Sequence, residues 1–399
     1  MNGFAPLQGV RVLDFSKILA GPLCTQYLAD LGAEVIKVEP LGAGDDTRHW
    51  PPFEGGVGTV FLSVNRNKSS LAIDLKSAAG LEACRRLAAI SDVAVESFSP
   101  GVAERLGVGH DALKEVNPRL VYCSISGYGT IGRMREGKGY DVILQAFTGM
   151  LSITGEPGGN PVRSPFSPVD QATGLHAVIG ILGGLLERAR TGHGVKVEAS
   201  LFDTAVAFLG YFLQGYWQRG TEPERPGSGH ESLCPYQVFE TSDHPLILGV
   251  ANDALWQAFC KVAGVPEIAN LSQFRTGADR VRNRSETVTT VQKLMLTRPR
   301  AEWLRVLDEA GIPCSPVNTL GELSAHPHTR ESGMVFDYGK SDATSLKGVA
   351  PAVRVDDERP GPRTPPPKLG ENSIDALRTA GYSAQEIERL IRDKIVQVT

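Results

Sequence analysis

Apolar residues in the first half of the chain alternate between short continuous runs and sets with helical spacing. The runs Val10–Asp14 and Glu34–Glu39 predict buried strands, and the segment from Pro22 to Gly32 between them predicts a helix. A β-α-β unit of this kind joins parallel strands. Because the alternation continues to about residue 200, we expect a mostly parallel sheet with helices on both faces. The further strands expected are Leu71–Leu75, Asp92–Glu96, Arg119–Ser126 and Val195–Val197.

The pattern changes after a long helix expected from Leu201 to about Trp217. Residues Arg219–Glu231 are rich in glycine, proline and charge, which is typical of a linker. The following runs Tyr236–Glu240 and Leu246–Val250 predict a hairpin. Three helical patterns come next, over Ala254–Ala263, Ser285–Leu296 and Ala301–Ala310. These elements indicate a second, small α+β domain.

The end of the chain returns to the first domain in this interpretation. Met334–Tyr338 and Leu346–Val355 predict strands, and Ser373–Ile395 predicts a helical tail that packs on the first domain. The expected boundaries are 1–205 and 330–399 for the large domain, 225–325 for the small domain, and 206–224 and 326–370 for the linkers.

Composition narrows the class of protein. A length of 399 residues exceeds what one core usually supports, and 41% apolar with 22% charged residues is typical of a globular protein. The net charge of −4 argues against a nucleic-acid partner. Six cysteines without a C-x-x-C pair predict reduced thiols. With no signal-peptide pattern and no apolar run approaching the roughly 20 residues of a membrane span, we expect a cytoplasmic protein without a membrane partner.

The stretch Ser164–Gly174 holds the strongest candidate for chemistry. Two prolines keep the chain extended up to Asp170. A helically spaced apolar set follows, made of Leu175, Val178, Ile179, Leu182, Leu185 and Leu186. We therefore expect Asp170 at the N-cap of a long helix, ionised and held in one orientation. Such a carboxylate is either an ordinary structural cap or a nucleophile.

Several common sites are not supported by the residues. The first β-α turn, Ser16–Pro22, has one glycine where a dinucleotide-binding turn has three, so Glu39 is not expected to bind the ribose of a nicotinamide or flavin cofactor. The eight histidines show neither H-x-x-x-H nor H-E-x-x-H spacing, which argues against a catalytic metal. A serine-hydrolase G-x-S-x-G elbow is also missing.

Four polar loops have two interpretations each. In Gly42–Arg48 the paired carboxylates bind a metal or, as we favour, one of them pairs with the arginine. Val64–Ser69 is either a solvated turn or a phosphate contact. Ser126–Gly129 and Gly137–Asp141 are either flexible turns or places where backbone N–H groups hold an oxyanion.

Taken together, the ordered motifs resemble the family III CoA-transferases, the CaiB/BaiF type. The resemblance extends from Leu7 to about Val396. The segments that show it are Val12–Phe15, Ala20–Pro22, Gly32–Glu39, Gly44–Arg48, Glu96–Gly101, Ser124–Gly129 and Gly139–Asp141.

The resemblance implies that Asp170 is the catalytic carboxylate. In this family the aspartate attacks an acyl-CoA thioester to form a mixed anhydride, and the CoA thiolate then converts the anhydride into an aspartyl-CoA thioester. A carboxylic acid acceptor takes the CoA by the reverse steps. The matching positions for CoA contacts are Phe98, Arg105, Lys138, Tyr140, Lys76 and Ile73. Coenzyme A, as acyl-CoA substrate, is thus the implied cofactor, without a metal, nicotinamide or flavin.

The family fold implies a Rossmann-like large domain built from both chain ends, a small α+β domain and an interlocked homodimer. Leu19 stands where the oxalate enzyme of the family has glutamine, and Ser97 replaces a common asparagine. The first departure argues against formyl or oxalate specificity. The Gly42–Arg48 and Val64–Ser69 segments look more like members that use dicarboxylates such as succinate or glutarate, which makes succinyl-CoA a candidate donor.

Three other functions are alternatives to CoA transfer. An α-methylacyl-CoA racemase of the same fold would use a histidine–aspartate pair, with histidine where this chain has Tyr140. A CoA-binding protein without catalysis would not need Asp170. A dinucleotide-dependent oxidoreductase would need the missing glycines. The residues favour the transferase.

Overall fold

The computed structural model describes residues 4–341, 344–361 and 363–399. The chain forms two compact units. The larger unit consists of Met1–Thr148, Ser164–Gln214 and Pro327–Thr399, and the smaller unit of Gly149–Arg163 and Gly215–His326. The domain boundaries expected from the sequence stay a prediction.

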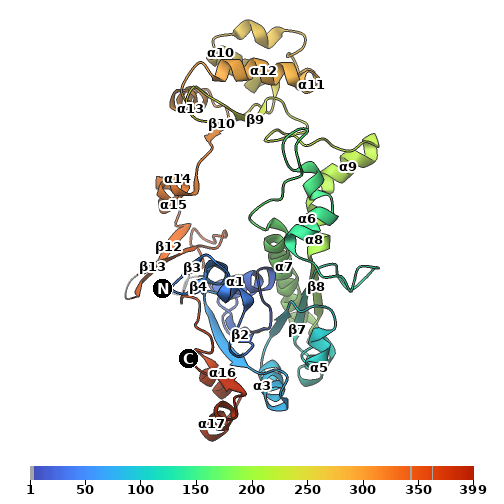
Figure 1. The fold of residues 1–399 in the computed structure, drawn as a ribbon, viewed down its shortest axis with the longest axis vertical. Coiled ribbons are helices and arrows are strands. Elements are labelled where there is room, and N and C mark those ends of the chain that lie inside the picture. Colours follow the sequence, from blue (N-terminus) through green and yellow to red (C-terminus); the bar gives the residue numbers. More distant parts are fainter. Residues whose placement is uncertain (1–3, 342–343, 362) are drawn as a thin grey trace. The chain divides into compact units, whose positions relative to one another are not determined.

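A mostly parallel sheet forms the centre of the larger unit, as the sequence predicted (Figure 1). Among the described residues it has seven strands in the order β14-β5-β2-β1-β6-β7-β8. The strands are β1 (Arg11–Asp14), β2 (Glu34–Glu39), β5 (Lys68–Ile73), β6 (Val93–Glu96), β7 (Val121–Ser126), β8 (Lys196–Ser200) and β14 (Val396–Gln397). All neighbours pair in parallel except β14, which pairs antiparallel with β5.

The strand order reverses at β1. The chain passes from β1 through β2 to β5 on one side, and from β6 through β7 to β8 on the other. The loops that leave the carboxyl ends of β1 and β6 therefore diverge and open a crevice, the usual ligand position in such sheets. The residues at this crevice are Phe15–Leu19 and Ser97–Gly101.

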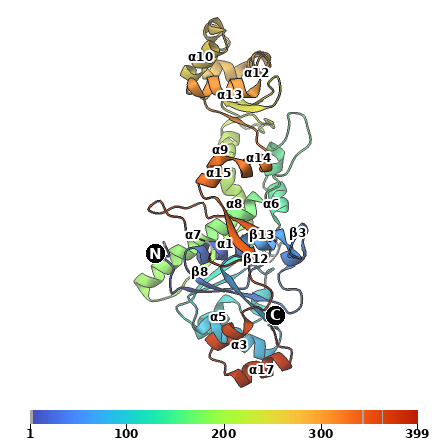
Figure 2. The ribbon, with the colours of Figure 1, turned by 90° about the vertical axis from the view of Figure 1, so that its left-hand side faces the viewer.

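Helices cover both faces of the sheet, as the two ribbon views show (Figures 1 and 2). Helices α1 (Ala20–Asp30) and α7 (Pro168–Thr191) pack against each other on one face. On the other face lie α3 (Ala78–Ala89), α5 (His110–Val116), α16 (Ser373–Thr379) and α17 (Ala384–Arg392). Leu377 and Ile387 of the tail are buried in the same hydrophobic core as Leu87 of α3.

The remaining elements of the larger unit are short. They are α2 (Thr59–Val64), β3 (Phe53–Glu54), β4 (Val57–Gly58), α4 (Val102–Arg105), α6 (Asp141–Phe147), α8 (Leu201–Phe208), α15 (Pro327–Glu331), β12 (Val335–Ser341) and β13 (Thr344–Val349). Helix α9 (Gly210–Arg219) continues into the smaller unit. The single long helix expected from Leu201 is wrong, because the chain leaves the helix at Leu209. The tail is also not one helix, since α16 and α17 are separate and the unpredicted strand β14 follows them.

The smaller unit has a three-stranded antiparallel sheet among its described residues, in the order β11-β10-β9. Its elements are β9 (Tyr236–Phe239), β10 (Leu246–Gly249), α10 (Asp253–Val262), α11 (Gly277–Arg282), α12 (Arg284–Met295), α13 (Arg300–Glu309), β11 (Cys314–Pro316) and α14 (Leu320–Ala325). The hairpin β9–β10 is confirmed, whereas β11 and α11 were not predicted. Stacked rings of Trp256, Phe259 and Trp303 form the centre of its core.

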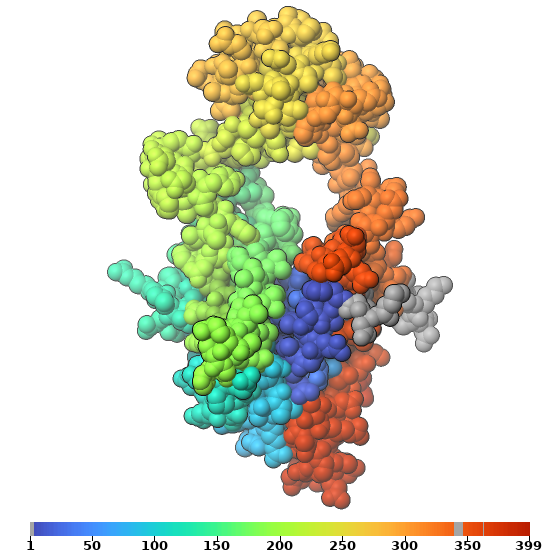
Figure 3. All heavy atoms as spheres, turned by 180° about the vertical axis from the view of Figure 1, so that it is seen from behind, coloured from blue at the N-terminus to red at the C-terminus, as the bar shows by residue number. Residues whose placement is uncertain are grey.

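Helix α7 is the one helix of the described residues that is long and apolar enough to cross a membrane. In the larger unit it packs as a core helix, with Val169, Ala177 and Ile181 buried against α1, β7 and β8. Its outer side lies at the surface beside the N-terminal residues, green next to blue in Figure 3.

The contact of α7 with α1 depends on a glycine. A Cβ atom on Gly174 would lie 2.6 Å from the carbonyl oxygen of Ala20, whereas one on Gly183 of the same helix would meet nothing within 4 Å. We expect Gly174→Ala to lower the free energy of unfolding by about 1–3 kcal/mol, because the two helices must separate. The matched control Gly183→Ala should raise it by about 0.5–1 kcal/mol. Urea unfolding of both variants measures this, and equal effects would contradict the close contact.

Candidate active site

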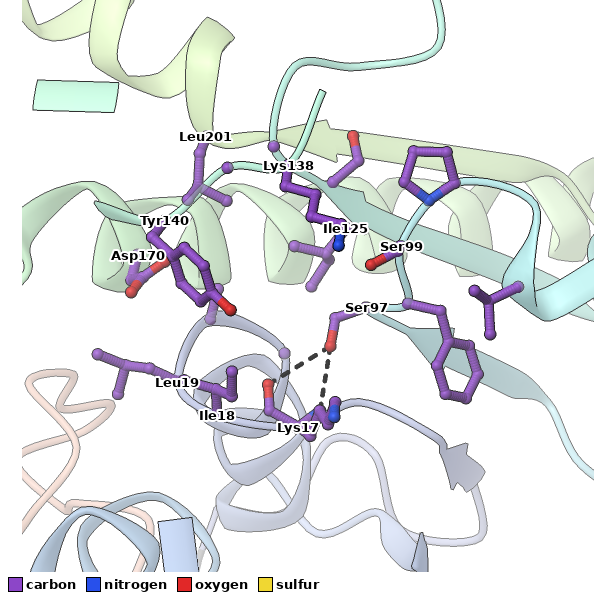
Figure 4. Close-up of a pocket in the computed structure, with 18 of the residues that line it drawn as sticks. Lys17, Ile18, Leu19, Ser97, Ser99, Ile125, Lys138, Tyr140, Asp170 and Leu201 are labelled. Atoms are coloured by element: carbon purple, nitrogen blue, oxygen red, sulfur yellow. Dashed lines mark hydrogen bonds between the residues drawn. The ribbon is translucent and has the colours of Figure 1, made fainter. Parts of the chain in front are cut away.

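A cavity of about 340 Å³ lies at the carboxyl ends of β1, β6 and β7 (Figure 4). The loop Lys17–Gly21 forms one wall, and the segments Ser97–Pro100 and Gly137–Tyr140 form others. Asp170 enters the cavity from α7 and Leu201 from α8. In the close-up, Ile18 and Leu19 lie on the α1 side and Lys138 lies across from them.

Asp170 is the third residue of α7, so the prediction that it is the N-cap is wrong. The helix begins at Pro168, and the N-cap is Ser167, whose backbone is left-handed with φ 52°. Proline suits the first helical position because its N–H would have no helical partner and its φ is already fixed. The helix therefore begins three residues earlier than expected, with its N-cap at residue 167 instead of residue 170.

The backbone N–H groups beside Asp170 are bound by a second carboxylate. Asp141 Oδ2 accepts hydrogen bonds from the backbone N of Val169 at 2.8 Å and of Asp170 at 3.1 Å. Asp141 is buried at the start of α6, and Gln145 donates its side-chain amide to the other carboxylate oxygen. The N-terminus of α7 thus stabilises Asp141, and these two donors are not available to the carboxylate of Asp170.

This arrangement makes Asp170 a weak acid. Burial raises the pKa of Asp170, and the nearby charge of Asp141 raises it further, to about 7. The expectation that Asp170 always stays ionised is therefore wrong. Near neutral pH the protonated and ionised forms are both populated, so a modest change in its surroundings changes the fraction that can act as a nucleophile.

The predicted CoA contacts fall around two adjoining cavities. Tyr140 and Lys138 line the cavity of Asp170, while Ile73 and Lys76 line a neighbouring cavity of about 480 Å³. Phe98 lines both.

Arg105 lies on α4 with an exposed side chain and lines neither cavity. The sequence assigns no role to Asp141, the last residue of Gly137–Asp141. Only the fold, which brings α6 to the start of α7, reveals its contact with Asp170.

The arginines of two polar loops have internal partners that the sequence did not indicate. Arg48 pairs internally, but with Glu39 at 2.7 Å, so the expected pairing with one of the two aspartates of Gly42–Arg48 is wrong. Those aspartates, Asp45 and Asp46, pair with Lys37 and Lys17. Glu39 also accepts from Ser70 Oγ at 2.7 Å, so its carboxylate is already bound within the protein. Arg66 is buried in an ion pair with Asp30 at 2.7 Å, so it is a structural residue, and both interpretations of Val64–Ser69, a solvated turn and a phosphate contact, are wrong for it. The described residues contain no group of three His, Cys, Asp or Glu suited to a metal ion.

Comparison with known proteins places these residues in a family. The model of CoA-transferase family III matches residues 7–373. The chain is 40% identical to an acyl-CoA transferase of Fusarium pseudograminearum over 98% of this chain and 88% of that protein. It is 38% identical to the human succinyl-CoA:glutarate CoA-transferase over 99% of this chain and 91% of that protein. A solved CaiB/BaiF family protein from Brucella suis has a TM-score of 0.84 and 34% identity, covering 94% of this chain and 99% of that one.

The raised pKa of Asp170 has a consequence for stability. Because the folded state holds the proton of Asp170 more tightly than the unfolded chain, whose ordinary pKa is 3.8, stability falls as pH rises from the ordinary value through about 7. Asp170→Asn removes this loss. We expect the variant to melt above the unmodified protein, by about 2 °C or more at about pH 8 and by less at about pH 5.

Thermal unfolding followed by circular dichroism at both pH values measures this difference. In an Asp141→Asn background the gain should shrink, since the neighbouring negative charge is gone. A gain that does not depend on pH would contradict the raised pKa.

Proposed function

The chain belongs to CoA-transferase family III and is a CoA-transferase, and we propose that Asp170 carries the acyl and CoA groups during transfer. The observation that carries the proposal is the carboxylate of Asp170 in a cavity of about 340 Å³, with a pKa raised to about 7. A poorly solvated carboxylate is a better nucleophile than one held by strong donors.

The reaction proceeds through two kinds of covalent intermediate. Ionised Asp170 attacks the thioester carbonyl carbon, the C–O bond of a mixed anhydride forms, and the C–S bond breaks to release CoA thiolate. The thiolate then attacks the carbonyl carbon of Asp170, which gives an aspartyl-CoA thioester and frees the donor carboxylate. An acceptor carboxylate attacks this thioester and reverses the two steps. No water is consumed, and the energy of the thioester is kept.

The glycine turns beside the cavity supply candidate donors for the tetrahedral oxyanions. Gly127 and Gly139 both line the cavity, and a Cβ on Gly127 would lie 2.6 Å from the backbone N of Gly139. Side chains are therefore excluded here, and the backbone of both glycines borders the cavity of Asp170. Oriented N–H groups stabilise a developing negative charge without reorganisation.

For CoA itself, we place the nucleotide in the cavity of Ile73 and Lys76, and the pantetheine between Phe98 and Tyr140. Phe98 supports this path because it lines both cavities. Lys138, and Arg105 from α4, suit the phosphates as charged donors.

Succinyl-CoA is the proposed donor and a dicarboxylate such as glutarate the proposed acceptor. The human relative that carries this name, at 38% identity, supports the choice. Arg48 and Arg66 are held in internal ion pairs, so they are poor candidates for binding a substrate carboxylate. Lys138 lines the cavity of Asp170 with an exposed side chain and is better placed for this role. Lys17 lines the same cavity but pairs with Asp46 at 2.9 Å.

The proposal includes the assembly and the compartment. We place the enzyme in the cytoplasm as an interlocked homodimer, with a large Rossmann-like domain of 1–205 and 330–399 and a small domain of 225–325. Exposed apolar side chains along one side of α7 support a second copy as partner: Leu175 is 40%, Ile179 67% and Leu186 74% exposed.

Trapping with hydroxylamine tests the covalent role of Asp170. The protein is mixed with succinyl-CoA, quenched with hydroxylamine and digested, and an activated carboxyl is converted into a hydroxamate with a mass gain of about 15 Da. We expect this gain on the peptide that contains Asp170, only when the thioester is present.

The control is Asp170→Asn, which preserves shape and should bind CoA while losing at least about 10³-fold in turnover. Full turnover by this variant would contradict the role of Asp170. No adduct with a panel of acyl-CoAs, together with exchange of the substrate α-proton in heavy water, would favour the racemase.

The homodimer is tested by introducing charge on α7. Ile179→Glu with Leu186→Glu places two carboxylates on the apolar side, and we expect sedimentation velocity to show a shift from dimer to monomer. Gly183→Ala on the same helix is the control and should stay dimeric. An unmodified protein that sediments as a monomer would refute the assembly.

A further inference from the structure

The loop between β1 and α1 contains a backbone conformation that its sequence does not favour. Ile18 has a positive φ of 73°, in the left-handed region. A β-branched residue is rarely found there, so the surrounding structure must hold it. Ile18 and Leu19 of this loop line the cavity of Asp170. The strained residue is therefore part of the wall of the active site.

A buried ion pair holds this loop from below. Lys37 Nζ in β2 donates to the backbone oxygen of Ser16 at 2.8 Å and pairs with Asp45 Oδ2 at 2.9 Å. The two carboxylate oxygens of Asp45 lie 3.4 and 3.3 Å from the backbone N of Ile18. The pair thus binds the backbone on both sides of Lys17: Lys37 binds the carbonyl of Ser16, and Asp45 binds the N–H of the strained residue Ile18.

Two further contacts fix the neighbouring residues. Ser97 Oγ accepts from the backbone N of Lys17 at 3.0 Å, as the dashed lines in Figure 4 mark. Asp14 Oδ1 accepts from the backbone N of Ser16 at 2.9 Å. The backbone N–H groups of Ser16, Lys17 and Ile18 are therefore each bound by a different side chain of the larger unit.

The burial of Lys37 and Asp45 indicates that the pair positions the loop and adds little to stability. Their side chains are 1% and 0% exposed, and the strand neighbours Ile36 and Val38 of Lys37 are buried apolar residues. Burial opposes the charge of Lys37, but the charges of Asp45, Asp14 and Glu39 together outweigh burial and raise the pKa of Lys37, so the pair is ionised. A buried ion pair adds little stability compared with apolar residues. What it provides here is a fixed position for the loop.

The loop is in turn connected to the helix of Asp170. A Cβ on Gly21 would lie 2.2 Å from Ser16 Cβ, so the start of α1 follows the loop closely. The carbonyl of Ala20 lies against Gly174, one helical turn after Asp170. A shift of the loop would therefore change the width of the cavity at the reacting carboxylate.

We propose that Lys37 and Asp45 are positioning residues of the transferase, which hold Ile18 in its left-handed conformation and so set the distance between the loop and Asp170. Both side chains act through the backbone of Ser16 and Ile18 and need not touch the acyl group. The effect on turnover rests on the proposed function of Asp170. The effect on the loop does not.

The main variant is Lys37→Met with Asp45→Asn. Methionine fills the volume of lysine, and asparagine still accepts from Thr47, which Asp45 caps at 3.0 Å, so no lone buried charge remains. We expect kcat to fall by about 10²-fold while KM for the thioester stays within about threefold, because misplacement affects the transition state more than binding. Hydrogen exchange of the amides of Ile18 and Leu19 should become faster.

A rescue separates positioning from general damage. Glycine adopts a left-handed backbone without strain, so Ile18→Gly in the double variant should recover part of the lost kcat. Leu87→Ala, which removes a buried side chain of α3 from the core, is the control for a loss of stability without a change in the loop. It should leave kcat within about twofold. If the double variant does not fold, Asp45→Asn alone is measured in the same way.

A folded variant with kcat within about twofold of the unmodified enzyme would overturn the proposal. So would a fall in Leu87→Ala as large as that in the double variant. If Asp170→Asn keeps full turnover, the proposed function fails, but the exchange of the Ile18 amide still decides whether the pair holds the loop. Unchanged exchange would refute the pair's role independently of any catalysis.

Discussion

The chemistry of this site depends on the hydrogen bonds between the carboxylate of Asp141, which begins α6, and the backbone N–H groups in the first turn of α7. Asp141 accepts hydrogen bonds from the backbone N of Val169 and of Asp170. These donors at the N-terminus of α7 are therefore not available to stabilise another carboxylate. Asp170 is left with desolvation and a negative neighbour, both of which favour its protonated form. The protein thus stabilises one carboxylate at the expense of the other, and the less stabilised one faces the cavity. Two adjacent acids with different surroundings can serve two purposes.

The charged residues under the sheet crevice are largely internal supports. Glu39 with Arg48 and Asp14 with Lys68 are buried pairs at 2.7 and 3.1 Å that involve the last residues of β2 and β1. The buried pair of Asp30 with Arg66, at 2.7 Å, instead lies before the first residues of β2 and β5. Such pairs add little to stability relative to apolar packing, but they select one arrangement of the loops they connect. The two pairs at the ends of β1 and β2 consequently hold the loops below the crevice, while Lys138 and Lys76 at its rim have exposed side chains.

The parallel sheet and the candidate Asp170 could be predicted from the sequence because each produces a local pattern of residues. Apolar runs predicted β1, β2 and β6, and prolines followed by helical spacing marked the start of α7. Its first residue was misplaced because a left-handed Ser167 has no sequence signal. The partners of Arg48 and Arg66 were beyond prediction in detail, since Asp30 lies 36 residues from Arg66. The predicted ionisation of Asp170 was wrong for the same reason, because its burial and the approach of Asp141, 29 residues away in sequence, both arise only in the fold and raise its pKa.

The pairing of β14 with β5 has a consequence for how the chain is made. Residues 396–397 complete the edge of a sheet whose other strands lie within the first 200 residues, and α16 and α17 complete the core beneath it. During synthesis this edge stays uncovered until the ribosome has passed Gln397, while the smaller unit has already emerged. Contacts this distant in sequence form slowly, and an open strand edge invites pairing with other chains. A nascent chain of this protein therefore exposes the edge of β5 until residues 396–397 have been made and have paired with it.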